Sequence, residues 1–208
     1  TVSWEDYGAR QTVFDDYDTL EHFSQVKTFQ ELIGARLSGG KDEAEEIAML
    51  IEDLNPKLFN ALGAAVRTLS VATNEEDFAQ VGLSARRYLE QLADVLFPPR
   101  NVLLNGRKVG KAEYRNRIWA YIVESFSVNK DEEAIKSIGK ETDRLVDEVN
   151  AILHSAKDFE RTLTCFVDLA KLTILLLSLP SEKSRNAYVA YASNMEKLLN
   201  ELLNKKEL

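Results

Sequence analysis

The sequence contains little cysteine, histidine, proline or glycine: its 208 residues include 1 Cys, 2 His, 4 Pro and 9 Gly. A single cysteine cannot form an internal disulfide, so nothing points to an oxidising compartment, and we expect a cytoplasmic protein. The histidines and the cysteine lack the spacing of zinc ligands, so we predict no metal. The scarcity of proline and glycine predicts few long loops.

Motifs for cofactors and nucleophiles are missing as well. The sequence has no Walker loop, no dinucleotide-binding glycine pattern, no G-x-S-x-G and no readable Cys–His pair, and we therefore predict no cofactor. The 26 Lys and Arg are outnumbered by 34 Asp and Glu, which gives a net charge of −8. This balance argues against a broad DNA-binding surface but leaves room for a local basic pocket that binds RNA.

The most apolar run of the chain, residues 163–179, contains Asp168 and Lys171. Because a charge in mid-span is costly in a bilayer, we interpret this run as a buried core helix and expect no membrane association. Cys165 lies in the same run, and we interpret it as a small buried hydrophobic residue.

Helical periodicity dominates the chain, and the period-two alternation of strands is almost absent. We predict an all-α bundle of about seven to eight helices, with one short loop or hairpin at 100–110 that turns at Asn105-Gly106. We interpret residues 1–18 as an N-terminal arm or the remnant of an upstream segment, and residues 19–208 as one helical domain. The predicted helices span about 19–37, 41–54, 56–72, 75–97, 111–126, 131–154 and 158–179, and an eighth starts at Ser181 or Ser184.

Capping residues support several of these boundaries. Asn55 with Pro56 behind it predicts the start of one helix, and Thr73 or Asn74 predicts the start of the next. The apolar stripes are less regular. In the first helix, the side chains expected on the buried face form an imperfect stripe: Leu20, Phe23, Val26, Lys27, Leu32 and Ile33. In the second, Ile47, Leu50, Ile51 and Leu54 fall on one face.

His154 is the first candidate for chemistry. It belongs to a row spaced by four, Val146, Asn150 and His154, which we expect to lie away from the apolar stripe of its helix. A histidine near a helix C-terminus can titrate near neutrality and act as a general acid or base. The alternative is an exposed or capping histidine at a helix end. For His22 we expect no catalytic role.

The basic candidates are the pair Arg86-Arg87 and the segment "YRNRIW", which contains Asn116 and Arg117. An arginine can hold a phosphate through two parallel hydrogen bonds, and the aromatic residues of the segment can stack on a base. We take Arg86, Asn116 and Arg117 as candidate substrate-binding residues. The alternative is that each arginine is solvated and pairs with nearby acidic residues.

Three stretches, "SARRYLEQLADVLFPPR", "GRKVGKAEYRNRIWAYI" and "LVDEVNAILHSAKDFERTLTCFVDLAKL", together resemble the HEPN-like helical domains of prokaryotic defence and abortive-infection proteins over about residues 55–179. The resemblance implies a bundle that often dimerises, with a metal-independent RNase site made of an arginine, four to six intervening residues, and a histidine. His154 matches that histidine. The positions for the arginine hold Asp147, Glu148 and Val149, and Arg144 lies too far back.

Three functions follow as hypotheses. The first is a HEPN-like interaction or regulatory module of a defence or stress-response protein, acting as a homodimer or with a partner protein. The second is a metal-independent ribonuclease in which His154 is the acid or base, Arg86 and Arg117 bind phosphate, and Asn150 orients it. The third is a helical scaffold unrelated to defence. Convergence of Arg86, Arg117, Asn150 and His154 in one pocket would favour the second hypothesis, and their dispersal would contradict it.

Overall fold

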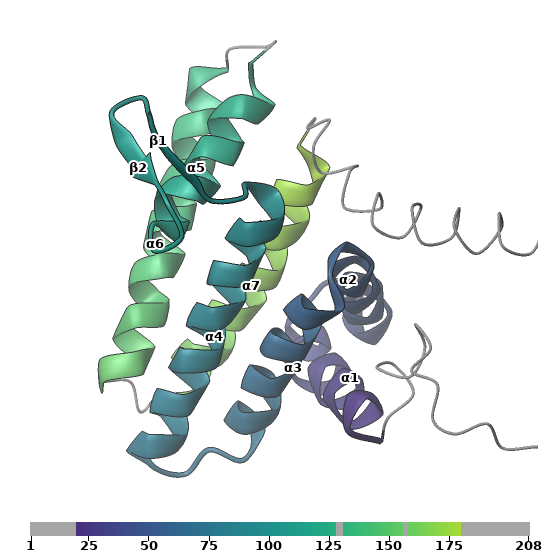
Figure 1. Cartoon of the computed structure of the whole chain (residues 1–208). Coiled ribbons are helices and arrows are strands. Elements are labelled where there is room, and N and C mark those ends of the chain that lie inside the picture. The colour runs from purple at the N-terminus through teal and green to yellow at the C-terminus, as the bar shows by residue number, and fades with distance from the viewer. Residues whose placement is uncertain (1–19, 128–130, 156–157, 180–208) are drawn as a thin grey trace, which may run out of the picture.

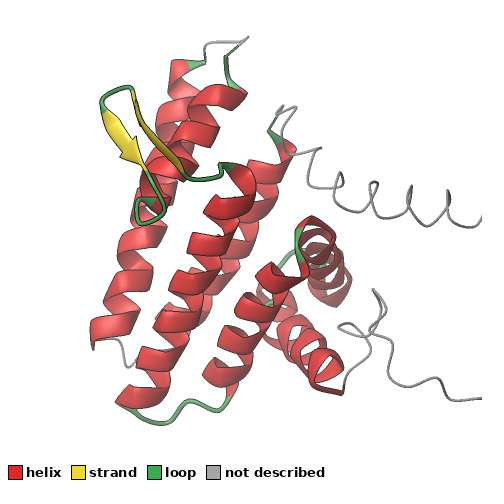
Figure 2. Cartoon of the chain, in the orientation of Figure 1, coloured by secondary structure: helices red, strands yellow, loops and turns green. Residues whose placement is uncertain are grey.

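A computed structural model describes residues 20–127, 131–155 and 158–179, and it confirms the all-α class (Figures 1 and 2). The predicted arm at 1–18 and the predicted eighth helix lie outside the described residues. The described elements are the helices α1 (Leu20–Leu32), α2 (Gly40–Leu54), α3 (Pro56–Ser70), α4 (Glu75–Leu96), α5 (Tyr114–Ser125), α6 (Glu132–Ser155) and α7 (Phe159–Ser178), a 3-10 turn η1 (Gly34–Arg36), and the strands β1 (Arg100–Leu104) and β2 (Arg107–Val109).

Helix α4 lies in the middle of the bundle, where it packs against α3, α5 and α6 (Figure 1). The stripe that its sequence predicts is buried, from Phe78 and Val81 near its start to Leu96 at its end. Helices α1 and α2 pack on the other side of α3, away from α6. The buried residues therefore form one continuous core from α1 to α6, and α4 contributes side chains to it between α3 and α6.

Helix α7 is held to the bundle by buried polar contacts as well as by its apolar residues. The hydroxyl of Tyr88 on α4 hydrogen-bonds the hydroxyl of Thr173, and the Tyr121 hydroxyl donates to the Leu176 carbonyl at 2.9 Å. Cys165 is buried as expected, and burial raises the pKa of its thiol to about 12. Within the part of the chain that the structure describes, no helix is long and apolar enough to cross a membrane.

The segment after α4 forms the predicted hairpin. Strands β1 and β2 are antiparallel, and Leu104 pairs with Arg107 across a two-residue turn. Asn105 and Gly106 have φ values of 48° and 78°, the left-handed conformation that such a turn requires. Val109 is buried and anchors the hairpin, whereas Val102 and Leu103 are exposed.

Helix starts follow the predicted caps. The Asn55 side chain accepts a hydrogen bond from the Lys57 N–H, with Pro56 at the first helical position. Asn74, rather than Thr73, caps α4, and its side chain accepts from the Asp77 N–H while the Asp77 carboxylate accepts from the Asn74 N–H. These bonds satisfy N–H groups that a helix start would otherwise leave unpaired.

Replacement of Asn74 by alanine is expected to lower the free energy of unfolding by about 1 kcal/mol, because the capping box is lost. Urea denaturation measures the change. Asn60→Ala, at an exposed position within α3, is the matched control and leaves stability unchanged or slightly higher. Equal midpoints for the two variants would contradict the assigned cap.

The predicted stripes of α1 and α2 are partly wrong. Leu20 and Phe23 are 89% and 58% exposed, and Leu50 is 48% exposed. Helix α1 instead turns His22, Gln25 and Phe29 toward the core. The buried face of α1 is set by its antiparallel packing on α3, so it includes two polar side chains that no hydrophobic pattern selects.

Candidate functional site

Tyr114, the first residue of α5, lies where three helices meet. The Asn150 side chain of α6 hydrogen-bonds its hydroxyl, and Arg86 and Glu90 of α4 lie within electrostatic range, as does Arg115. The Arg86 Nε donates to Glu90 Oε1 at 3.0 Å. We call these five residues the Tyr114 cluster. Burial raises the pKa of Tyr114, and the two arginines oppose that rise, so the hydroxyl is a neutral hydrogen-bonding group at neutral pH.

His154 lies one turn beyond Asn150 on α6, and it is exposed. Helices α5 and α6 are antiparallel: Tyr114 faces Asn150, and Trp119 Nε1 donates to Asp143 at 3.1 Å. Because α5 begins at Tyr114, no residue of α5 lies opposite His154. The histidine is therefore at an open helix end, as both of its interpretations require.

The expectation that the His154 row avoids the core is wrong for its first member. Val146 is 1% exposed, Asn150 is half-buried, and His154 is exposed. Helix α6 contacts α4, α5 and α7, so its buried arc is wider than a single stripe. The row thus leads from the core out to the surface.

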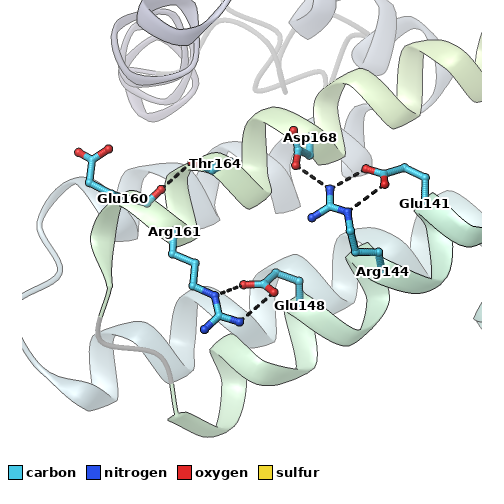
Figure 3. Close-up of polar contacts among 7 residues, drawn as sticks. All are labelled: Glu141, Arg144, Glu148, Glu160, Arg161, Thr164 and Asp168. Atoms are coloured by element: carbon cyan, nitrogen blue, oxygen red, sulfur yellow. Dashed lines mark hydrogen bonds and ion pairs between the residues drawn. The ribbon is translucent and has the colours of Figure 1, made fainter.

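The carboxylates that stand where an RNase arginine is expected bind arginines of neighbouring helices. Asp147 accepts from Arg115 of α5. Glu148 accepts two hydrogen bonds from Arg161 of α7, from Nε at 2.5 Å and from Nη2 at 3.0 Å (Figure 3). Such paired geometry fixes both side chains. The acidic residues before His154 therefore tie α6 to α5 and α7.

Arg144 makes a second link between α6 and α7 (Figure 3). Its Nε and Nη2 donate to the two oxygens of Glu141 at 2.9 and 2.6 Å, and Nη2 also reaches Asp168 at 2.6 Å. The hydrogen bonds from Arg144 hold the pKa of Glu141 below its ordinary value. The charge of Asp168, with that of Lys171, is the reason to interpret residues 163–179 as a core helix and not as a membrane span. Asp168 pairs with Arg144 at the surface between α6 and α7.

Arg117, a predicted phosphate ligand, is 1% exposed. Its Nη1 donates to Asp94 at 2.6 Å and to the Phe97 carbonyl at 3.3 Å, and its Nη2 donates to the Lys111 carbonyl at 3.2 Å. Asp94 lies in the last turn of α4, Phe97 directly follows that helix, and Lys111 follows the hairpin. Arg117 therefore closes the base of the hairpin, and its guanidinium is turned away from solvent.

Asn116 also supports the hairpin. Its side-chain Nδ2 donates to the Lys108 carbonyl at 3.0 Å, which ties α5 to strand β2. Trp119, from the same segment, lies against Gly139 of α6 and beneath the Arg107 guanidinium, which is 5.6 Å from its ring centroid. The aromatic and amide groups of "YRNRIW" are thus engaged in packing.

The predicted site residues come together only in part. Asn150 hydrogen-bonds Tyr114, Arg86 lies within electrostatic range of the same tyrosine, and His154 follows Asn150 by one turn. Arg117 and Asn116 lie at the hairpin base and do not face that cluster. A pocket at the α3–α4 turn is lined by Thr73, Asn74, Glu75 and Phe78 and includes none of the predicted residues.

A buried pair of titratable residues was not expected from the sequence. His22 Nε2 of α1 lies 3.2 Å from Glu52 Oε1 of α2, and the two side chains are 10% and 13% exposed. The His22 ring meets Phe59 edge-on at 5.8 Å between centroids. Burial, with a smaller contribution from Asp53, raises the pKa of Glu52 from 4.5 to about 7. The two residues lie 30 positions apart in the sequence, and neither flanking sequence carries a signal for the pair.

The raised pKa of Glu52 makes stability depend on pH. Between its ordinary pKa of 4.5 and its folded pKa of about 7, the folded protein holds a proton that the unfolded chain has released. Stability is therefore lost as pH rises through this window. From pH 5 to 8 we expect the wild type to lose about 1 to 2 kcal/mol relative to Glu52→Gln.

Denaturant unfolding at the two pH values checks this prediction. Glu46→Gln, an exposed residue of the same helix, is the matched control and follows the wild-type pH dependence. Parallel profiles for wild type and Glu52→Gln would mean that Glu52 titrates as an ordinary carboxyl.

Among residues 20–127, 131–155 and 158–179, no three His, Cys, Asp or Glu side chains are grouped so as to hold a metal ion. Comparison with protein-family models, with curated proteins and with solved structures finds no match to this chain.

Proposed function

We propose that this protein is a HEPN-like interaction or regulatory module of a prokaryotic defence or stress-response system, which acts by binding protein surfaces and does not cleave RNA. One observation carries the proposal: the side chains that a nuclease would need for phosphate are bound within the chain. Arg117 is buried on Asp94, Asn116 holds the Lys108 carbonyl, and Arg86 is paired with Glu90.

Electrostatics around His154 support the same proposal. The turns of α6 that precede it carry Asp147 and Glu148, and an RNA phosphate approaching His154 meets these carboxylates. Their charges are balanced by Arg115 and Arg161, which are already hydrogen-bonded to them. A phosphate would have to displace a carboxylate from an arginine, which gives little net gain.

A metal-independent ribonuclease is the second candidate, and the Tyr114 cluster favours it. Asn150, which lies one turn before the exposed His154, hydrogen-bonds Tyr114, and Arg86 lies within electrostatic range of that tyrosine. In this reading Arg86 leaves Glu90 to bind phosphate, and His154 takes a proton from the RNA 2′-OH. Arg117 has no part in it because its guanidinium is buried.

RNA binding separates the two candidates. A fluorescein-labelled RNA 12-mer of mixed sequence is titrated with protein at roughly 0.15 M salt, and anisotropy is recorded. The interaction module is expected to bind it no more tightly than about 100 µM, with no change in Arg86→Ala, because Arg86, Arg115 and Arg161 are already paired with carboxylates. Arg87→Ala, at the exposed neighbouring position, is the matched control. Micromolar binding that Arg86→Ala weakens tenfold and Arg87→Ala does not would favour the ribonuclease.

A further inference from the structure

The hairpin carries exposed apolar and basic residues. Val102 and Leu103 are 54% and 66% exposed, and Arg107, Lys108 and Lys111 of the same segment are exposed as well. Leu103 pairs with Lys108 across the two strands, so these two side chains share a face. Residues 100–111 contain four basic side chains and no acidic one. In the described part of the chain, neither lysine forms an ion pair. We call Val102, Leu103, Arg107, Lys108 and Lys111 the hairpin surface.

Helix α2 presents the opposite charge. Met49 and Leu50 are 57% and 48% exposed, and Asp42, Glu46 and Asp53 are exposed beside them on the outer side of the helix. Residues 42–53 contain six acidic side chains and no basic one. We call Asp42, Glu46, Met49, Leu50 and Asp53 the α2 surface. Each surface thus has two large apolar side chains, one set among cations and the other among carboxylates.

The two surfaces cannot meet within one chain. Figure 1 places the hairpin and α2 on opposite sides of the bundle, with α4, α7 and α3 between them. Among residues 20–127, 131–155 and 158–179, none covers either apolar pair, and contact of these side chains with water costs free energy that burial would recover. Two copies in the same orientation bring the hairpin surface of one against the α2 surface of the next.

We propose that the hairpin surface of one copy binds the α2 surface of a second copy, so that the protein associates head to tail. The contact joins different surfaces on the two copies, and it leaves one surface of each kind free at the ends of the assembly, so further copies can add. This inference rests on the proposed binding role and names a partner for it. Since each surface offers only two large apolar residues, the contact is weak and depends on salt.

Sedimentation velocity of the full chain tests the proposal. At roughly 50 mM salt, the average mass is expected to rise with protein concentration, and at roughly 0.5 M salt it falls toward that of the monomer. The double variant Lys108→Glu/Lys111→Glu reverses the charge of the two lysines on the hairpin surface. The double variant Glu46→Lys/Asp53→Lys reverses the charge of two carboxylates on the α2 surface. Each variant alone is expected to associate at least tenfold more weakly than the wild type. Arg87→Glu/Lys171→Glu is the matched control, at exposed positions of α4 and α7.

An equimolar mixture of the two reversed variants gives the sharpest result. Opposite charges face each other again across the contact, so the mixture is expected to associate although each variant alone does not. A wild type that stays monomeric at low salt overturns the proposal. Association that is weakened by only one of the two charge-reversed variants also overturns it, because a contact between two identical surfaces would give that result. Circular dichroism confirms that each variant is folded.

The RNA-binding experiment and the sedimentation experiment can overturn the two proposals independently. RNA binding that depends on Arg86 would overturn the proposed function while leaving the sedimentation result as it is. A monomeric wild type that binds no RNA would overturn only the head-to-tail contact.

Discussion

Replacement of Arg117 by methionine is expected to lower the free energy of unfolding by about 3 kcal/mol or more, the largest effect of any single substitution at the predicted site residues. Methionine fills much of the same volume but donates no hydrogen bond. The carbonyls of Phe97 and Lys111 lose their donors, and the Asp94 carboxylate loses its partner. Asp94 is 48% exposed and can turn toward water, so the unpaired carbonyls dominate the loss.

Guanidinium denaturation of Arg117→Met measures this loss. Arg115→Met is the matched control, because Arg115 is 38% exposed and its ion pairs lie on the surface. We expect the control to lose less than about 1 kcal/mol. A stable Arg117→Met protein would contradict the structural role and return Arg117 to the list of phosphate ligands.

Replacement of Gly82 by alanine is expected to cost about 2 to 4 kcal/mol. A Cβ at this position would lie 2.6 Å from the Leu153 backbone nitrogen and 2.7 Å from its Cα. Backbone atoms within a helix cannot shift on their own as a flexible side chain can, so the added methyl group forces α4 and α6 apart. That separation loosens the packing of both helices and disturbs the Tyr114 cluster, which depends on their register.

Thermal or denaturant unfolding of Gly82→Ala tests the close approach. Gly63→Ala in α3 is the matched control: its Cβ would lie 3.2 Å from Cβ of Gln25, a side chain that can shift, and alanine favours the helix. We expect the control to stay within about 1 kcal/mol of the wild type. Equal losses in both variants would show that the α4–α6 contact is not specially tight.

The parts of the fold that the sequence predicts are those fixed by neighbouring residues. Asn55 and Asn74 cap helices through bonds two or three residues away, and Asn105-Gly106 sets the hairpin turn by its own φ values. The exposure of Leu20 and Leu50 could not be read in this way. Which side of α1 or α2 is covered depends on α3, and a repeating pattern of apolar residues does not locate a packing partner.

The site is less predictable because its contacts join distant segments. The burial of Arg117 requires that the chain return across a hairpin to the end of α4. The gathering of Arg86 and Asn150 around Tyr114 depends on how α4 and α6 pack, and these helices approach closely at Gly82. The sequence identifies residue types that can bind phosphate, and tertiary contacts decide whether they are free to do so.

We propose that α6, the helix of His154, has a structural role and takes no part in RNA cleavage. Incubation of a mixed RNA pool in EDTA with the wild type and with His154→Ala, at concentrations where the protein is folded and associated, tests this proposal. We predict that neither protein shortens the RNA. Cleavage by the wild type that His154→Ala abolishes would contradict the proposal, and it would make the protein a metal-independent ribonuclease.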